Sequence, residues 1–387
     1  MISFDNTKTA FEYKNDKELK KAYLLFKLIG MPTLSSIGMK MATLGLKLNL
    51  PITGMIKSTV FDQFCGGETI SDSEKTMDKL AKYGVHSLLD YSVEGKESES
   101  DFNSCSKMIQ KTISIAKDND HIPFAVFKVT GVMRFALLEK LNAKETLTEE
   151  ETLEYEKAYK RIDAICKKGF NLGVPVMIDA EESWIQDAID EIVEEMMAKY
   201  NKAKAVIYNT VQMYRHDRLK YLKDSHDRSR DGGYFIGVKI VRGAYMEKER
   251  ARAIEKGYES PIQPNKDATD RDYNLALEYA LENHAGISIC AGTHNEYSSL
   301  ILTQLLDKYS VEKDNSTVYF AQLLGMSDHI SFNLSKEHYR VVKYVPFGPV
   351  KDVMPYLIRR AEENTSISGQ SSRELLLLKK EKQRRKI

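Results

Sequence analysis

Two adjacent arginines near the C-terminus, Arg359 and Arg360, lie in the sequence Tyr-Leu-Ile-Arg-Arg-Ala-Glu-Glu-Asn of residues 356–364. Paired guanidinium groups present planar, bidentate donors that suit a carboxylate or a phosphate. If the segment is helical, spacings of three, four and seven place Tyr356, both arginines and Glu363 on one face. The pattern therefore predicts a helix that binds an anion.

The neighbouring residues predict that this helix packs against a core. Val350, Val353 and Leu357 are apolar and recur at helical spacing, and Pro355 suits a first helical turn. Arginines held next to a core usually bind an anion rather than water alone, which raises the question of what chemistry takes place beside them.

Further polar residues lie in or directly after short apolar runs. They are Lys128, Asp179, Gln212, Lys239, His294, Asn295, Gln322 and Tyr344. Taken one at a time, each has a structural interpretation: Asp179 could cap a helix that starts near Glu181, and His294 could be a hydrogen-bonded structural histidine. An ammonium group in an apolar strand is costly without a partner or ligand, so Lys128 and Lys239 are the stronger functional candidates.

Residues 242–245, Arg-Gly-Ala-Tyr, follow one of these runs. They could form a tight turn and nothing more, or the glycine could let backbone amides approach a phosphate. Taken jointly with the arginine helix, the polar strand ends predict a site for a large, polar, phosphorylated ligand. The sequence lacks a P-loop and a G-x-G-x-x-G fingerprint, which argues against Walker-type or Rossmann phosphate binding. It also lacks the G-x-S-x-G motif of esterases. Because it has no clustered Cys/His ligands, we expect no metal.

The elements that must position these residues form a regular series. Eight β-rich apolar runs alternate with charged segments of helical spacing; the runs are 86–91, 124–130, 175–179, 205–212, 235–241, 287–291, 317–323 and 341–345. Eight such units predict an α/β fold, a (β/α)8 TIM-type barrel, with functional groups at the carboxyl ends of the strands. A doubly wound open sheet is the alternative. We expect residues 140–160 to form a solvated helix and residues 215–233 to form a surface loop.

The N-terminal region is basic and apolar. No acidic residue lies between Glu18 and Asp62, whereas Lys20, Lys21, Lys27, Lys40, Lys47 and Lys57 do. We favour a helical arm, residues 1–65, packed on a barrel of residues 66–387 or on a second subunit. A segment lying in a membrane interface is the alternative. The uncharged run from Leu28 to Met39 is too short to span a bilayer, and we expect no secretory signal.

Composition excludes several classes of protein. Lys plus Arg total 57 against 56 acidic residues, which gives no reason to expect nucleic-acid binding. The 42% hydrophobic content supports a substantial core. Four scattered cysteines without a C-x-x-C pair suit a reducing compartment and argue against structural zinc.

At these residues the sequence resembles the proline dehydrogenase family, flavoenzymes that oxidise L-proline. The resemblance rests on segments in matching order and spacing, namely 178–182, 209–212, 239–245, 293–295, 322–326, 343–348 and 356–364. The forms of 239–245 and 257–264 are closer to the eukaryotic-type branch than to bifunctional bacterial enzymes. The resemblance implies a distorted barrel with FAD at the carboxyl ends of the strands and the last helix over the flavin.

The resemblance also implies residue roles. Arg359 and Arg360 would bind the proline carboxylate with Asp179 paired to them, Tyr344 and Tyr356 would wall the pocket, Lys128 would support the network, and Ile240 and Leu323 would contact the proline ring. Cofactor contacts would come from Asp179, Gln212, Lys239, Val241, Gly243, Ala244, Tyr245, His294, Asn295, Gln322 and Glu363. The size of Tyr344 implies a preference for proline over 4-hydroxyproline.

The implied reaction is hydride transfer from C5 of proline to flavin N5, which gives Δ1-pyrroline-5-carboxylate in the first step of proline catabolism. Electrons would pass to a quinone, so the family implies a cytoplasmic protein with peripheral membrane contact on the inner face, or a mitochondrial one in a eukaryote. Two other functions stay open at this point: a Schiff-base aldolase that uses a strand lysine, and a non-catalytic, membrane-associated scaffold.

Overall fold

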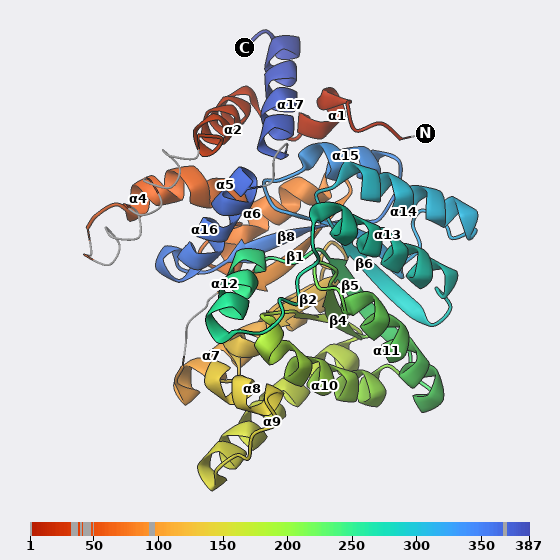
Figure 1. The fold of residues 1–387 in the computed structure, drawn as a ribbon. Coiled ribbons are helices and arrows are strands. Elements are labelled where there is room, and N and C mark those ends of the chain that lie inside the picture. Colours follow the sequence, from red (N-terminus) through yellow and green to blue (C-terminus); the bar gives the residue numbers. More distant parts are fainter. Residues whose placement is uncertain are drawn as a thin grey trace. The chain divides into compact units, whose positions relative to one another are not determined.

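Eight parallel strands close into a barrel in sequential order, from β1 to β8 (Figure 1). The computed structural model describes residues 2–31, 38, 41, 48, 50–92, 97–366 and 370–387, and the side chains of all of these except 361–366 and 370–372. The strands are β1 (Val85–Tyr91), β2 (Phe124–Lys128), β3 (Val176–Asp179), β4 (Ile207–Gln212), β5 (Ile236–Val241), β6 (Ile287–Gly292), β7 (Val318–Leu323) and β8 (Val341–Phe347). The predicted barrel is therefore confirmed, and the open sheet is wrong.

Each strand begins and ends within two residues of its predicted run. The largest differences have local causes. Residues Val129–Gly131 form a turn of 3-10 helix, η2, instead of extending β2. Strand β8 continues through Pro346, whose carbonyl oxygen accepts a hydrogen bond from the amide of Gly66 at 2.8 Å.

The chain forms two compact units, which we describe separately: residues 1–94 with 321–387, and residues 95–320. The first, which we call the terminal unit, holds β1, β8 and the end of β7. Its helical elements are α1 (Thr7–Phe11), α2 (Asp16–Ile29), α4 (Thr53–Ile56), η1 (Lys57–Phe61), α5 (Asp62–Phe64), α6 (Ile70–Ala81), α15 (Asp328–Lys336), α16 (Val350–Ser366) and α17 (Gln370–Arg385).

The second, which we call the central unit, holds β2 to β6 and the start of β7. Its helices are α7 (Glu99–Lys117), α8 (Phe135–Asn142), α9 (Glu149–Leu172), α10 (Ser183–Tyr200), α11 (Arg218–Gly232), α12 (Met246–Lys256), α13 (Lys266–Glu282) and α14 (Glu296–Lys308). Strands β4, β5 and β6 pair in parallel, and their apolar side chains are almost entirely buried, as expected for strands covered on both faces.

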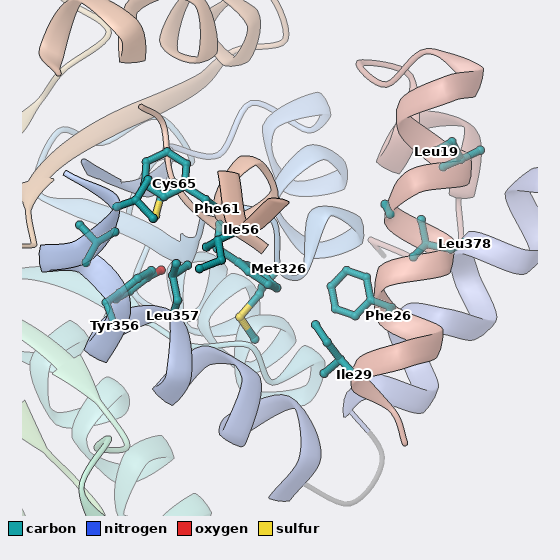
Figure 2. Close-up of a cluster of buried hydrophobic side chains, with 14 of the residues drawn as sticks. Leu19, Phe26, Ile29, Ile56, Phe61, Cys65, Met326, Tyr356, Leu357 and Leu378 are labelled. Carbon is teal, nitrogen blue, oxygen red and sulfur yellow. The ribbon is translucent and has the colours of Figure 1, made fainter. Parts of the chain in front are cut away.

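An apolar cluster within the terminal unit joins its N-terminal and C-terminal helices (Figure 2). Leu19, Phe26 and Ile29 of α2 belong to it, together with Phe61 of η1 and Leu378 of α17. Residues of the predicted arm in α1, α2, η1 and α5 thus contribute to this unit's core. Lys40 and Lys47 lie outside the described residues.

The expected loop at residues 215–233 is wrong, because residues Arg218–Gly232 form α11. Its buried face consists mainly of Leu222, Ser225, His226 and Ser229, so the segment shows little apolar periodicity. Gly233 adopts a left-handed conformation (φ 62°) and ends the helix, so this glycine marks a helix C-terminus.

Two other expected helices have different limits. The solvated helix expected at residues 140–160 is interrupted: α8 ends at Asn142, and α9 begins at Glu149 after a capping box formed by Thr148 and Glu151. Helix α16 begins at Val350, so Pro355 lies inside it and not in its first turn. The amides of Asp352 and Val353 donate to the carbonyl oxygen of Pro349, which anchors the helix earlier than expected.

Candidate functional site

Three charged side chains meet at the strand ends of the central unit, and we call them the Lys–Asp–Lys cluster. Lys128 at the end of β2 lies opposite Asp179 of β3 in the strand register. The ammonium group of Lys239 on β5 donates a hydrogen bond to Asp179 Oδ1, and Lys128 Nζ lies 4.0 Å from Asp179 Oδ2. Lys239 is only 5% exposed, so its charge is held in a nearly dry place by this carboxylate.

The alternative in which Asp179 caps the following helix is wrong. Helix α10 begins at Ser183, and Glu182 occupies its N-cap position without a side-chain capping bond. Glu182 instead forms an ion pair with Lys248 of α12. Asp179 is thus paired with the two lysines of the cluster.

A buried carboxyl group that the sequence reasoning missed, Glu181, connects three strand ends. Its carboxylate accepts hydrogen bonds from the amide (3.0 Å) and hydroxyl (2.5 Å) of Thr130, directly after β2. Its own amide donates to Gln186 Oε1, and its carbonyl accepts from Gln212 Nε2 of β4, both at 2.7 Å. Burial raises the pKa of Glu181 to about 7, although the hydrogen bonds from Thr130 oppose the shift. The signal in the sequence that could have identified Glu181 is the acidic pair Glu181-Glu182, which follows Asp179 closely.

The turn after β5 is shaped by Gly243, which has φ 130°. A Cβ placed there would lie 2.6 Å from the ring of Tyr214, so only glycine fits. Gly243 and Ala244 are exposed, and Tyr245 is partly exposed at the N-cap position of α12. Of the preceding residues, Ile240 is fully buried and Val241 partly buried. The turn therefore presents open backbone at a strand end.

The end of β6 leads into the N-terminus of the 13-residue helix α14. Asn295 caps this helix by accepting a hydrogen bond from the amide of Ser298 at 3.0 Å, and His294 is partly exposed. Arg242 fixes the strand end by donating to Thr293 Oγ1 at 2.7 Å while it pairs with Asp270. A helix N-terminus of this length provides backbone amides and a dipole that favour anions.

The terminal unit holds the other predicted residues. Tyr356 and Arg360 of α16 are 5% and 7% exposed, and the Arg360 guanidinium carbon lies 5.2 Å from the centre of the Tyr356 ring. The predicted face of this helix is thus confirmed for these two residues, whereas Arg359 is partly exposed. Gln322 is buried and accepts from Ser331 Oγ at 2.9 Å. The side chain of Glu363 lies outside the described part of the chain.

A second buried ionic group, also missed from sequence, fixes the turn that follows Leu323. The ammonium group of Lys343, fully buried on β8, donates to the carbonyl oxygen of Met326 at 2.5 Å and to Asp328 Oδ1 at 2.8 Å. Asp328 also accepts from the hydroxyl of Tyr13 at 2.5 Å. Next to Lys343 along β8, Tyr344 is 8% exposed, and its carbonyl oxygen accepts from the amide of Leu324.

The residues of the central unit fit a flavin by the chemistry of their donors. The Lys–Asp–Lys cluster combines two cations with one anion, and a local positive excess suits a ring system that takes up electrons. The exposed backbone at Gly243 and the N-terminus of α14 suit a ribityl chain and a diphosphate.

Comparisons with known proteins agree on one family. The sequence profile described as Proline dehydrogenase matches residues 73–373. Proline dehydrogenase 1, mitochondrial, of Dictyostelium discoideum is 34% identical over 426 residues, which cover 98% of this chain and 74% of the relative. Hydroxyproline dehydrogenase of Xenopus laevis is 30% identical, with 97% of this chain and 88% of the relative covered.

The fold is also similar to that of solved structures. Proline utilization A (PutA) from Bdellovibrio bacteriovorus inactivated by N-propargylglycine aligns with a TM-score of 0.72 at 21% identity. The alignment covers 93% of this chain and 38% of that larger protein, and at this identity it supports the fold alone. On the family profile and the long curated relatives together, this chain belongs to the proline dehydrogenase family.

Proposed function

We propose that this chain oxidises L-proline to Δ1-pyrroline-5-carboxylate with FAD as its cofactor and a quinone as its final electron acceptor. The observation that carries the proposal is the Lys–Asp–Lys cluster, a group of one buried and two partly buried charged side chains at the strand ends of a barrel in this family. FAD, when bound, supplies the acceptor for the hydride that leaves C5 of proline. The protein's own residues bind, orient and shield the reactants.

For the cofactor, the proposal assigns the isoalloxazine ring to Lys239 and Gln212, with Asp179, Val241, Tyr245 and Gln322 beside it. The ribityl and diphosphate portion is assigned to the Gly243–Ala244 backbone, His294 and Asn295, with Glu363 on a ribityl hydroxyl. Lys239 is suited to its role because its salt bridge to Asp179 fixes the ammonium group at the strand end.

For the substrate, Arg359 and Arg360 bind the carboxylate of proline through bidentate hydrogen bonds. Tyr344 and Tyr356 exclude water from the ring, and Ile240 and Leu323 supply apolar contacts. Stacking of Arg360 on Tyr356 restricts the guanidinium group, which lowers the entropy lost when the carboxylate binds. Proline must also lose an amine proton before hydride leaves, and solvent water is a sufficient acceptor for it.

The purified protein tests this function directly. We expect bound FAD, identified by mass after release from the denatured protein, and we expect pyrroline-5-carboxylate to accumulate when L-proline and a soluble quinone are supplied. Borohydride would trap a Schiff base between a lysine and a carbonyl substrate if the protein were instead an aldolase. A protein without flavin and without turnover would support a scaffold.

A quinone acceptor requires access to a membrane, and we propose that α2 provides it. Leu24 and Leu28 of this helix are 58% and 55% exposed, although Leu19 and Phe26 on its other face are buried. No acidic residue lies between Glu18 and Asp62, which suits an anionic lipid surface. No helix in the described part of the chain is long and apolar enough to cross a membrane.

Vesicle co-sedimentation tests this contact. Leu24→Asp with Leu28→Asp should reduce binding to vesicles that contain anionic lipid, and Leu153→Asp, at a residue of α9 that is 57% exposed, should not. Point substitutions are preferable to deletion of the arm, because Phe11 and Phe26 belong to the buried cluster. Equal vesicle binding by the Leu24→Asp, Leu28→Asp double variant and by Leu153→Asp would contradict the proposed membrane contact.

A further inference from the structure

Glu181 is buried at the strand ends of the central unit, and the function proposed above gives it no role. It is 3% exposed and forms hydrogen bonds in three directions. Its carboxylate accepts both donors of Thr130, its amide donates to Gln186, and its carbonyl oxygen accepts from Gln212. One residue thus links the segment after β2, helix α10 and strand β4.

The position of Thr130 makes this link relevant to the flavin site. Thr130 lies in the short turn η2, which starts at the residue after Lys128. A carboxylate that holds the amide and the hydroxyl of Thr130 fixes the start of this turn, and with it the direction in which Lys128 leaves β2. Through its carbonyl oxygen, Glu181 also fixes the amide group of Gln212.

We propose that Glu181 is a positioning residue whose charged carboxylate holds Thr130, and through it Lys128, in place, and whose protonation loosens Lys128 and lowers activity. The inference rests on the proposed function, because Lys128 has a role only in that site. The charged form matters because each of its oxygens accepts one donor of Thr130. A protonated carboxyl group carries a hydrogen on one oxygen. Opposite the amide of Thr130 that oxygen loses its hydrogen bond, and opposite the hydroxyl it can only donate, so the hydroxyl must turn its own hydrogen away.

The surroundings of Glu181 bring the protonation of its carboxyl group close to neutral pH. Burial raises the pKa of Glu181 to about 7, and the charge of Glu182 adds to the shift, whereas Thr130 and Lys128 oppose it. Of the neighbouring charged groups, Lys128 also lies 4.0 Å from Asp179, which pairs with Lys239, and Glu182 pairs with Lys248. The carboxyl group is therefore charged above about pH 7 and neutral below it.

The pH dependence of kcat/KM for L-proline in the FAD-bound enzyme tests the inference. Between about pH 5.5 and 9 the wild type should lose activity as pH falls through a midpoint near 7. Glu181→Gln should lack this decline and show roughly tenfold lower kcat/KM at the alkaline end. Protonation of proline's own ammonium group lowers kcat/KM with falling pH in every variant alike, so the midpoint near 7 is read from the ratio of the wild-type value to the Glu181→Gln value. A ratio that stays constant between about pH 5.5 and 9 would overturn the proposal.

Two further variants separate positioning from a general structural role. Thr130→Val removes one hydrogen bond to the charged carboxylate, so the midpoint should rise by roughly half to one pH unit. Glu182→Gln is the matched control, because this neighbouring carboxyl group is also buried but pairs with Lys248. Glu182→Gln should keep the decline with pH, at a lower midpoint because the charge of Glu182 raises the pKa of Glu181, and an unchanged midpoint in Thr130→Val would count against the proposal.

Infrared spectroscopy provides a measurement that does not depend on turnover. The carbonyl stretch of a protonated carboxylic acid should gain a component in the wild type as pH falls through about 7, and Glu181→Gln should lack this component. Its absence from the wild type would refute the proposed titration even in an active proline dehydrogenase. If instead the band titrates but the protein does not oxidise proline, the proposed function fails while the titration stands.

Discussion

Lys239 shows how single residues define the site. A nearly buried ammonium group stabilises the fold only if a carboxylate compensates it, and Asp179 is that carboxylate. Asp179→Asn should therefore lower the free energy of unfolding by roughly 3–5 kcal/mol in urea denaturation of the cofactor-free protein. Glu191→Gln, at a surface ion pair with Lys144 whose two side chains are each 62% exposed, is the control, and it should cost about 1 kcal/mol or less. Similar losses for the two variants would contradict this account.

In the proposed site, Arg360 is the residue on which we expect substrate binding to depend most. Arg360→Ala would leave the carboxylate of proline poorly compensated beside a buried tyrosine, so kcat/KM should fall by the equivalent of roughly 2–5 kcal/mol. Arg360→Lys should recover only part of this loss, because lysine lacks the bidentate geometry. A near-normal kcat/KM in an FAD-bound Arg360→Ala enzyme would contradict the assignment of Arg360 to the carboxylate of proline.

Tyr344 bears on the choice between proline and 4-hydroxyproline, since relatives named for each substrate match this chain. A bulky side chain at this position should reject an added hydroxyl group by steric conflict and by leaving that hydroxyl without a partner. We therefore expect a higher kcat/KM for proline in the wild type and a smaller ratio in Tyr344→Ser. Comparable kcat/KM values for the two substrates in the wild type would overturn this assignment.

At the scale of elements, Lys343 and Asp328 join β8 to the turn after β7 and to the segment between α1 and α2. Burial opposes ionisation of Asp328, but the ammonium groups of Lys343 and Lys14 outweigh it and hold the pKa of this carboxyl group below its usual range. A carboxyl group with a lowered pKa adds stability above its usual pKa, and this stability is lost as pH falls through the lowered value. Asp328 therefore contributes to acid unfolding of the terminal unit.

Substitution of this pair tests its contribution. Lys343→Met should cost roughly 3–5 kcal/mol of unfolding free energy, because it leaves Asp328 buried without its main partner. Lys343→Met combined with Asp328→Leu should be more stable than Lys343→Met alone, since no buried charge of the pair remains. Additive losses in urea denaturation would show that the two residues act independently.

Sequence patterns predicted elements well where periodicity was strong and poorly where it was weak. The buried face of α11 is formed largely by serine and histidine, so its helical period was hidden by polar residues. The start of α16 was misplaced because Pro355 is typical of a first turn, whereas the carbonyl of Pro349 sets the real one. Apolar runs, in contrast, located all eight strands to within two residues.

At the scale of the whole molecule, eight repeated strand-and-helix units determined the barrel, since parallel strands buried on both faces leave few other arrangements. The polar residues at the strand ends could be named from the sequence. Their partners could not, because Glu181 contacts a residue 51 positions away and Lys343 one 15 positions away, and such pairing arises only on folding.

The central claim is that proline reduces a flavin bound to this chain. Anaerobic titration of the purified protein with L-proline, followed at the flavin absorption band, measures this reduction without any external acceptor. We predict that the band is bleached by L-proline, persists with D-proline, and returns when a quinone is added. A protein that carries FAD and keeps its full absorbance in excess L-proline would contradict the account.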